Sequence, residues 1–158
     1  MNEGKRWENT IKKCLGIECI RLYDTTNGYV GINNPCDFIY YAYPIQILIE
    51  AKTVKSDRMP FSNISDNQLG QLIEHGHIMG ELPIIFIYFR KSARAFIIPI
   101  SKINELISLG FKSISVGMCD NNDIALEIPL NKKIVNVEFD KKDFNIKVQK
   151  LWRDLKCE

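Results

Sequence analysis

The stretch CDFIYYAYPIQILIEAK, residues 36–52, is apolar along most of its length and yet carries three charged side chains. Ile, Phe and Tyr, which favour strands, dominate on both sides of the Tyr43–Pro44 step. This composition predicts one strand over 36–41 and a second strand over 45–52, joined as a β-hairpin around that step.

The register of this hairpin would bring the three charges together. Opposed residues of an antiparallel pair have a constant index sum, so a turn centred on the Tyr–Pro step places Asp37 opposite Glu50. Lys52 lies on the same face as Glu50 because side chains alternate along a strand, whereas Ala51 points to the other face. We therefore expect two carboxylates about 5 Å apart, with an ammonium beside them.

The paired carboxylates need a counter-ion, because two like charges among apolar neighbours are destabilising. Mg²⁺ is a natural candidate, since one or two carboxylates hold it while waters and substrate phosphate complete its oxygen ligands. Such an ion activates a bound water and stabilises charge on a scissile phosphate. Lys52 can then steady the developing charge or orient the attacking water. The hairpin therefore predicts Mg²⁺-dependent phosphodiester hydrolysis, with Mn²⁺ as a substitute metal.

Helices and strands are predicted on both sides of the hairpin. Trp7, Ile11 and Leu15 recur at helical spacing and predict an amphipathic helix over 3–16, with Glu8 near the edge of its apolar stripe. The other expected elements are strands over 19–24, 83–89, 95–100, 113–116, 124–128 and 134–139, helices over 65–76, 101–110 and 144–155, turns at 25–28 and 119–123, and a loop over 54–63.

Two of these elements have specific signals. Ser65 followed by Gln68 is a capping-box start for the second helix, and Ser101 is expected to cap the third. PIIFIYF, residues 83–89, is a nearly continuous apolar run, typical of a central strand covered on both faces. The order of the elements indicates a mixed α/β fold in which helices flank a mixed β-sheet.

Length and composition fit one cytosolic domain. With 158 residues, 46% hydrophobic and 25% charged, the chain has the composition of a single globular domain, 1–158. No apolar run reaches the ~18 residues of a membrane span, and no apolar stretch follows the charged N-terminus as in a signal peptide. The five cysteines are odd in number and lack a C-x-x-C pair, so we expect reduced, mostly buried thiols. A net charge of +2 does not by itself identify a nucleic-acid binder.

The charged end of the hairpin resembles the PD-(D/E)XK nuclease motif. The matching residues are Pro35, Asp37, Glu50, Ala51 and Lys52. Within that superfamily the chain is similar to the RecU family of Holliday junction resolvases, through segments in one colinear order over residues 2 to about 100. These segments are NEGKRWE at 2–8, IEAKT at 49–53 and MPFSNISDNQ at 59–68.

The resemblance implies a fold, an activity and a set of roles. The fold is a restriction-endonuclease-like mixed β-sheet flanked by α-helices. The activity is that of a homodimeric, Mg²⁺-dependent endonuclease that cuts four-way DNA junctions in recombination and repair, in the cytoplasm and at the nucleoid of a bacterium or phage-infected cell. By resemblance the metal-holding positions are Asp37, Glu50, Gln68 and Ala51, the group that stabilises the transition state is Lys52, the supporting acid of the first helix is Glu8, and a phosphate contact is Arg21.

The sequence also departs from the family pattern. Pro35 stands in place of a threonine and Asn67 in place of a histidine, and only TTNGYVGINN separates the first strand from the catalytic aspartate where relatives carry a stalk insertion. These departures leave the nuclease chemistry intact and leave the substrate open. A nuclease for duplex or flapped DNA and a catalytically silent DNA-binding module are the alternatives, and a compact archaeal resolvase of the Hjc type is a neighbouring comparison.

Other side chains could contact DNA or metal. The basic residues expected near the site, as backbone-phosphate contacts or as solvated charges, are Lys55, Arg58, Lys91 and Arg94. His75 and His77 at a helix end have poor spacing for a metal pair and are expected to be exposed C-cap residues. Tyr40, Tyr41 and Tyr43 could stack on bases but are expected to pack on the sheet, and Phe61 is a loop aromatic expected near substrate.

Overall fold

A six-stranded mixed sheet forms the centre of the computed structural model, which describes residues 1–23 and 34–157. The strand order is β1-β2-β3-β5-β6-β8, in which β3 and β5 are parallel and all other neighbours are antiparallel. The strands are β1 (Cys19–Arg21), β2 (Phe38–Ala42), β3 (Ile45–Val54), β5 (Glu81–Phe89), β6 (Arg94–Pro99) and β8 (Leu126–Ile128).

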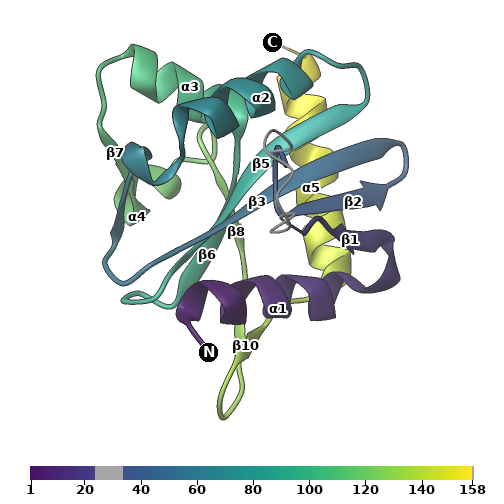
Figure 1. Ribbon diagram of the computed structural model, residues 1–158, viewed down its shortest axis with the longest axis vertical. Helices are drawn as coiled ribbons and strands as arrows, with labels where there is room; N and C mark the ends of the chain where they lie inside the picture. The colour runs from purple at the N-terminus through teal and green to yellow at the C-terminus, as the bar shows by residue number, and fades with distance from the viewer. Residues whose placement is uncertain (24–33, 158) are drawn as a thin grey trace, which may run out of the picture.

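Helices cover both faces of the sheet (Figure 1). One face packs against α1 (Glu3–Leu15) and α5 (Lys141–Lys156) through a core that includes Trp7, Phe86 and Phe144. The other face packs against the remaining elements, which are α2 (Asp66–Gly76), α3 (Ile100–Ser108), α4 (Val116–Cys119) and the strand pair β4 (Arg58–Pro60) and β7 (Ser113–Ser115). The mixed α/β prediction, and the prediction of a central strand covered on both faces, are confirmed.

The β2–β3 hairpin has the register expected from the sequence. Phe38 pairs with Ile49 and Ala42 pairs with Ile45, so each opposed pair has the predicted index sum. Beyond the last of these pairs, the Asp37 N–H still donates to the Ile49 carbonyl at 3.0 Å. This bond holds Asp37 against β3, next to Glu50.

Trp7 fixes α1 to the sheet. Its indole N–H donates to the carbonyl of Phe86 on β5 at 3.0 Å, and its ring meets the Phe86 ring edge-on with centroids 4.8 Å apart. Asn2 begins the helix as its N-cap, with its side chain accepting from the Lys5 N–H. The position of α1, and of the acidic side chain that follows Trp7, therefore depends on a buried aromatic contact with a central strand.

Three predictions about the segments around α2 and α3 are wrong. The expected loop 54–63 contains β4, which pairs with β7 so that Met59 faces Ile114, and both side chains are fully buried. Phe61 is also buried in the core rather than held out toward a substrate. Helix α3 begins two residues earlier than expected, with Pro99 as its N-cap, so Ser101 lies inside the first turn and does not cap it.

The elements near the two ends of the chain differ from the predictions mainly in length. The expected strand 19–24 is shorter, and the turn expected at 25–28 lies outside the described residues. The expected strand 134–139 is reduced to β10 (Val137–Glu138), which forms a small hairpin with β9 (Asn131–Lys132). The final helix is confirmed and extends from Lys141 to Lys156.

Cysteine burial agrees with the prediction of reduced thiols. All five cysteines are free; Cys19, Cys36 and Cys119 are buried and only Cys157 is exposed. None of the helices in the described ranges is long and apolar enough to cross a membrane.

Replacing Trp7 tests the attachment of α1. We expect Trp7→Phe to lower the free energy of unfolding by about 2 kcal/mol, because the indole hydrogen bond and part of the ring contact are lost. Urea unfolding followed by circular dichroism measures the change. Trp152→Phe is the matched control, since Trp152 is only partly buried, and an equal loss in both variants would contradict this role of Trp7.

Candidate active site

Asp37 and Glu50 directly follow the last β2–β3 pair, Phe38 with Ile49, and their carboxyl groups lie close together. The Asp37 carboxylate reaches across and accepts a hydrogen bond from the Ala51 N–H at 2.9 Å. This bond fixes the Asp37 side chain over β3. The register of the hairpin therefore sets the geometry of the pair.

Glu50 is a buried carboxylate on a central strand, only 4% exposed. Burial, with the nearby Asp37 carboxylate adding to it, raises the pKa of Glu50 to about 7. Burial also raises the pKa of Asp37, although the Ala51 N–H opposes this change. One oxygen of Glu50, Oε2, is buried without a hydrogen-bond partner. Such an atom is costly unless something else occupies its lone pairs.

Lys52 lies on the same face as Glu50, as strand alternation predicts. Its Nζ is 3.0 Å from Glu50 Oε1, and the two side chains are 20% and 5% exposed. The ammonium therefore balances part of the negative charge at the pair while it remains accessible from solvent. In this position it can contact an anion that approaches the carboxylates.

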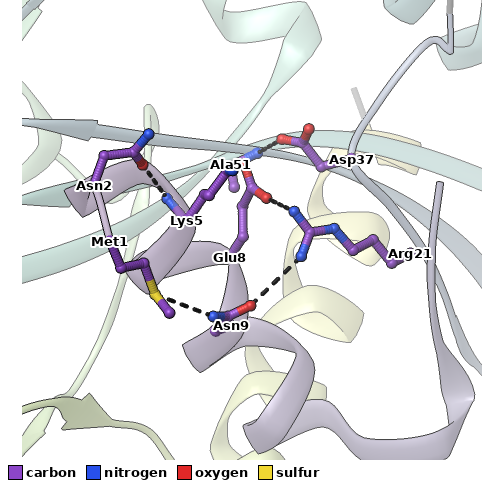
Figure 2. A network of polar contacts seen from close by, with 8 residues as sticks. All are labelled: Met1, Asn2, Lys5, Glu8, Asn9, Arg21, Asp37 and Ala51. Atoms are coloured by element: carbon purple, nitrogen blue, oxygen red, sulfur yellow. Dashed lines mark hydrogen bonds and ion pairs between the residues drawn. The ribbon is translucent and has the colours of Figure 1, made fainter. Parts of the chain in front are cut away.

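Glu8 approaches the pair from α1, and in Figure 2 it faces Arg21, while the Asp37 carboxylate points to Ala51. Glu8 forms an ion pair with Arg21 of β1, and burial followed by the nearby Asp37 charge raises the pKa of Glu8. The Arg21 guanidinium also lies over the rings of Tyr23 and Phe38, at 5.4 and 6.0 Å from their centroids. The sequence did not predict the Glu8–Arg21 pair, because the two residues belong to separate elements without a motif that links them.

Gln68 reaches Glu50 from the first turn of α2. Ser65 is the N-cap of this helix and accepts from the Gln68 N–H at 3.2 Å, as the capping-box signal predicts. The Gln68 side chain is half-buried, and its hydrogen bonding to Glu50 acts to lower the pKa of that carboxyl. Helices on opposite faces of the sheet thus bring Glu8 and Gln68 to the same pair of carboxylates.

The site offers oxygen ligands for a hard divalent cation. Residues 1–23 and 34–157 contain no cluster of three or more His, Cys, Asp or Glu side chains that could hold a metal ion. The oxygen donors at the site are instead the two carboxylates, which include the partnerless Oε2 of Glu50, and the amide of Gln68. Two carboxylates with further neutral oxygens and waters are the donor set that Mg²⁺ takes in proteins. The residues present therefore fit this ion.

Three of the predicted basic residues lie together at the turns that follow β3 and β5. Lys55 lies in the turn after β3 and Arg58 begins β4; both are exposed, and Arg58 donates to the Ser113 hydroxyl at 2.8 Å. Lys91 is 72% exposed, with its Nζ 4.0 Å from Asp57. The Arg90 N–H donates to the Val54 carbonyl at 2.9 Å, which holds the two turns side by side.

Arg94 is in a different environment. Its Nε and Nη2 atoms each lie 2.8 Å from the Glu127 carboxylate, and Nη2 lies 2.6 Å from Asp120. These hydrogen bonds raise the pKa of Arg94 further above its ordinary value and lower the pKa of Glu127. The guanidinium links β6 to β8 and the α4 segment, so its charge is neutralised within the fold.

The remaining candidates lie away from the carboxylates. His77 is an exposed C-cap, as expected, but His75 is half-buried, with its Nδ1 2.6 Å from Glu81. Tyr40 is buried, and its hydroxyl donates to Asn145 at 2.6 Å, which confirms its packing role. Tyr41 and Tyr43 are exposed, so the expectation that they pack on the sheet is wrong for these two.

Comparisons with known proteins identify a family and a fold. The family Recombination protein U, RecU, matches residues 8–149. Among solved structures, the chain is similar to Hjc, a Holliday junction resolvase from the archaeal hyperthermophile Archaeoglobus fulgidus, with a TM-score of 0.53 and 18% sequence identity over 80% of this chain and 93% of that one. At this identity the similarity concerns the fold. No curated protein sequence matches the chain.

The raised pKa of Glu50 should make the stability of the metal-free protein depend on pH. Its folded value of about 7 exceeds the ordinary 4.5, so the folded state binds the proton more tightly between these values. The free energy of unfolding then falls as the pH rises through this window, by on the order of 3 kcal/mol. In chelator we expect Glu50→Gln to exceed the parent in stability by about 2–3 kcal/mol near pH 8 and to match it near pH 4.5.

Urea unfolding at the two pH values, with and without Mg²⁺, measures this difference. Glu74→Gln is the control, because Glu74 is exposed on α2. Millimolar Mg²⁺ should stabilise the parent near pH 8 and leave Glu50→Gln unchanged. Equal unfolding midpoints for parent and Glu50→Gln near pH 8 in chelator would show that the ionised Glu50 carboxylate does not destabilise the folded protein.

Proposed function

The chain belongs to the RecU family, and we propose on this basis that it is a Mg²⁺-dependent endonuclease that resolves four-way DNA junctions. One observation carries the proposal. The half-buried Asp37 and the buried Glu50 form a carboxylate pair, Glu50 has a partnerless oxygen, and the Lys52 Nζ lies 3.0 Å from its other oxygen. A protein that only bound DNA would gain nothing from burying negative charge beside the phosphate it must approach.

Four positions would hold the metal ion. They are the carboxylates of Asp37 and Glu50, the Gln68 amide and the Ala51 backbone. When bound, Mg²⁺ supplies a water of lowered pKa and charge stabilisation at the scissile phosphate. The protein contributes the geometry, since the Ala51 N–H already fixes the Asp37 carboxylate at 2.9 Å.

Lys52 and the Glu8–Arg21 pair complete the proposed site. The Lys52 ammonium is directed at the place where a phosphate would meet the carboxylates, so it would stabilise the charge that develops on the phosphate oxygens or orient the attacking water. Glu8 is a positioning residue, held by Arg21 on the far side of Asp37. Because Arg21 is paired with Glu8 and stacked on aromatic rings, we propose that it acts through Glu8 at least as much as by contact with DNA.

Lys55, Arg58 and Lys91 are proposed to bind the DNA backbone beside the cut. All three are exposed, Lys55 and Lys91 on the adjacent turns that follow β3 and β5 and Arg58 at the start of β4. Phosphate contacts of this kind position a protein on DNA without reading sequence. Symmetric cutting of a junction needs two such sites, so we propose a homodimer that acts on bacterial or phage DNA in the cytoplasm.

The first experiment is a cleavage assay with an Asp37→Asn control. Purified protein is incubated with a labelled immobile four-way junction, a matched linear duplex and a flap, each with Mg²⁺ or with EDTA. We expect paired symmetric nicks in the junction that require Mg²⁺. Asp37→Asn should reduce the rate by at least about 1,000-fold, because it removes a metal ligand whose role is electrostatic.

The same variant separates binding from chemistry. Asp37→Asn should bind the junction at least as tightly as the parent, because one negative charge facing the phosphates is removed. Cleavage that survives in Asp37→Asn would remove the central assignment. Equal cutting of duplex or flap would leave the nuclease and reject the junction substrate, and binding of DNA without any cutting would favour the silent module.

A further inference from the structure

A small hairpin, β9–β10, projects from the body of the protein beyond α1, at the bottom of Figure 1. Val137 pairs with Lys132 and Glu138 with Asn131, in a two-stranded sheet separate from the central one. The Lys133 N–H donates to the Asn136 carbonyl at 2.7 Å and closes the tip. The hairpin thus has its own hydrogen bonds and a defined tip at residues 133–136.

The tip presents apolar and basic side chains to solvent. Ile134 is fully exposed and Val135 is 70% exposed, and they lie between Lys132 and Lys133 on one side and Asn136 on the other. A single exposed aliphatic residue is ordinary on a protein surface. Two adjacent β-branched residues at the end of a projecting hairpin, beside two lysines, suit insertion into a partner that is anionic outside and apolar inside.

The base of the hairpin is held firmly, so the tip is presented in one direction. Phe139, which follows β10, is buried against Trp7, Phe86 and Phe144. Glu138 pairs with Lys13 of α1 at 2.6 Å, and Glu138 also lies 3.8 Å from Lys133. The projecting strands therefore continue directly from the aromatic core.

The hairpin and the carboxylates lie on the two flanks of α1. Glu8 extends from one flank toward Asp37, whereas Arg6, Thr10 and Lys13 line a hollow of about 310 Å³ between the other flank and the hairpin. An α-helix with its side chains is only about 10–12 Å wide. A duplex of B-DNA spans more than this width within one turn. One DNA molecule can therefore reach both flanks at once.

The charges along this path favour a polyanion. Around the hairpin and its flank of α1 the basic residues are Arg6, Lys13, Lys132 and Lys133, and the acidic residues are Glu3 and Glu138. The outer face of α1 between the two flanks adds the exposed Lys5. The surface thus carries a net positive charge where DNA bound at the carboxylates would continue.

We propose that the β9–β10 hairpin is a second DNA-binding element, which rests on the proposed nuclease function. Lys132 and Lys133 bind backbone phosphates on the arm next to the cut. Ile134 enters the strand junction, where an apolar side chain can contact bases that are incompletely stacked. The hairpin therefore gives the protein a preference for branched over continuous DNA.

Salt-dependent binding tests the two lysines. The binding affinity of Lys132→Ala/Lys133→Ala is measured against salt concentration on an immobile four-way junction, in an Asp37→Asn background that prevents cleavage. Each phosphate contact contributes about 0.9 to the slope of log affinity against log salt, so the slope should fall by between 1 and 2, with about tenfold weaker binding. Lys142→Ala/Lys150→Ala, two exposed lysines of α5, is the matched control and should leave both unchanged.

Ile134→Asn tests the apolar tip. It leaves the charge unchanged and should weaken junction binding severalfold while duplex binding stays the same. If the lysine variant binds with the same salt slope as the parent, the proposed phosphate contacts are overturned. If Ile134→Asn binds junction and duplex as the parent does, the proposed contact at the strand junction is overturned. In both cases cleavage of junctions by the wild-type protein still supports the proposed function. If the wild-type protein neither binds nor cuts any of the DNAs, the proposed function itself fails and the hairpin proposal fails with it.

Discussion

Two carboxylates forced together by the register of one hairpin are the constraint on which the rest of the site depends. Asp37 and Glu50 directly follow the last pair of β2 and β3, and β3 is enclosed by β2 on one side and β5 on the other. A strand buried in this way cannot turn its side chains toward water without breaking both pairings. The negative charge therefore stays in place, and the surrounding elements compensate for it.

The compensation comes from both faces of the sheet. Lys52 balances Glu50 along the same strand, the Ala51 N–H satisfies one oxygen of Asp37, and Gln68 reaches in from α2. From the other side, α1 brings Glu8 with its own counter-charge, Arg21. What remains uncompensated is the partnerless oxygen of Glu50 and the raised pKa of the pair. Proteins retain such destabilising arrangements where function requires them, and a bound cation would relieve both.

Local signals in the sequence predicted the parts of this arrangement that depend on nearby residues. The hairpin register follows from a short turn, the start of α2 from Ser65 and Gln68, and the buried stripe of α1 from helical spacing. Pairings between distant, short segments were not predictable in this way. Strands β4 and β7 are three residues each and meet across more than fifty positions, so neither has enough alternation to identify its partner. Phe61 was misplaced for the same reason, since its burial depends on that pairing.

Charged residues show the limit of sequence analysis most clearly, because a sequence gives the number of charges but not their partners. Arg94 and Lys91 lie close together in the chain and were expected to act alike on DNA. The structure ties Arg94 to two carboxylates and leaves Lys91 largely exposed. Conversely, Lys132 and Lys133 precede the expected strand 134–139 and belong to no motif, yet they are exposed in the β9–β10 hairpin beside the helix that supports the site. The net charge of +2 thus includes charged side chains that are neutralised by partners within the fold and charged side chains that are grouped on one surface. Only the charges grouped on the surface can determine what the protein binds.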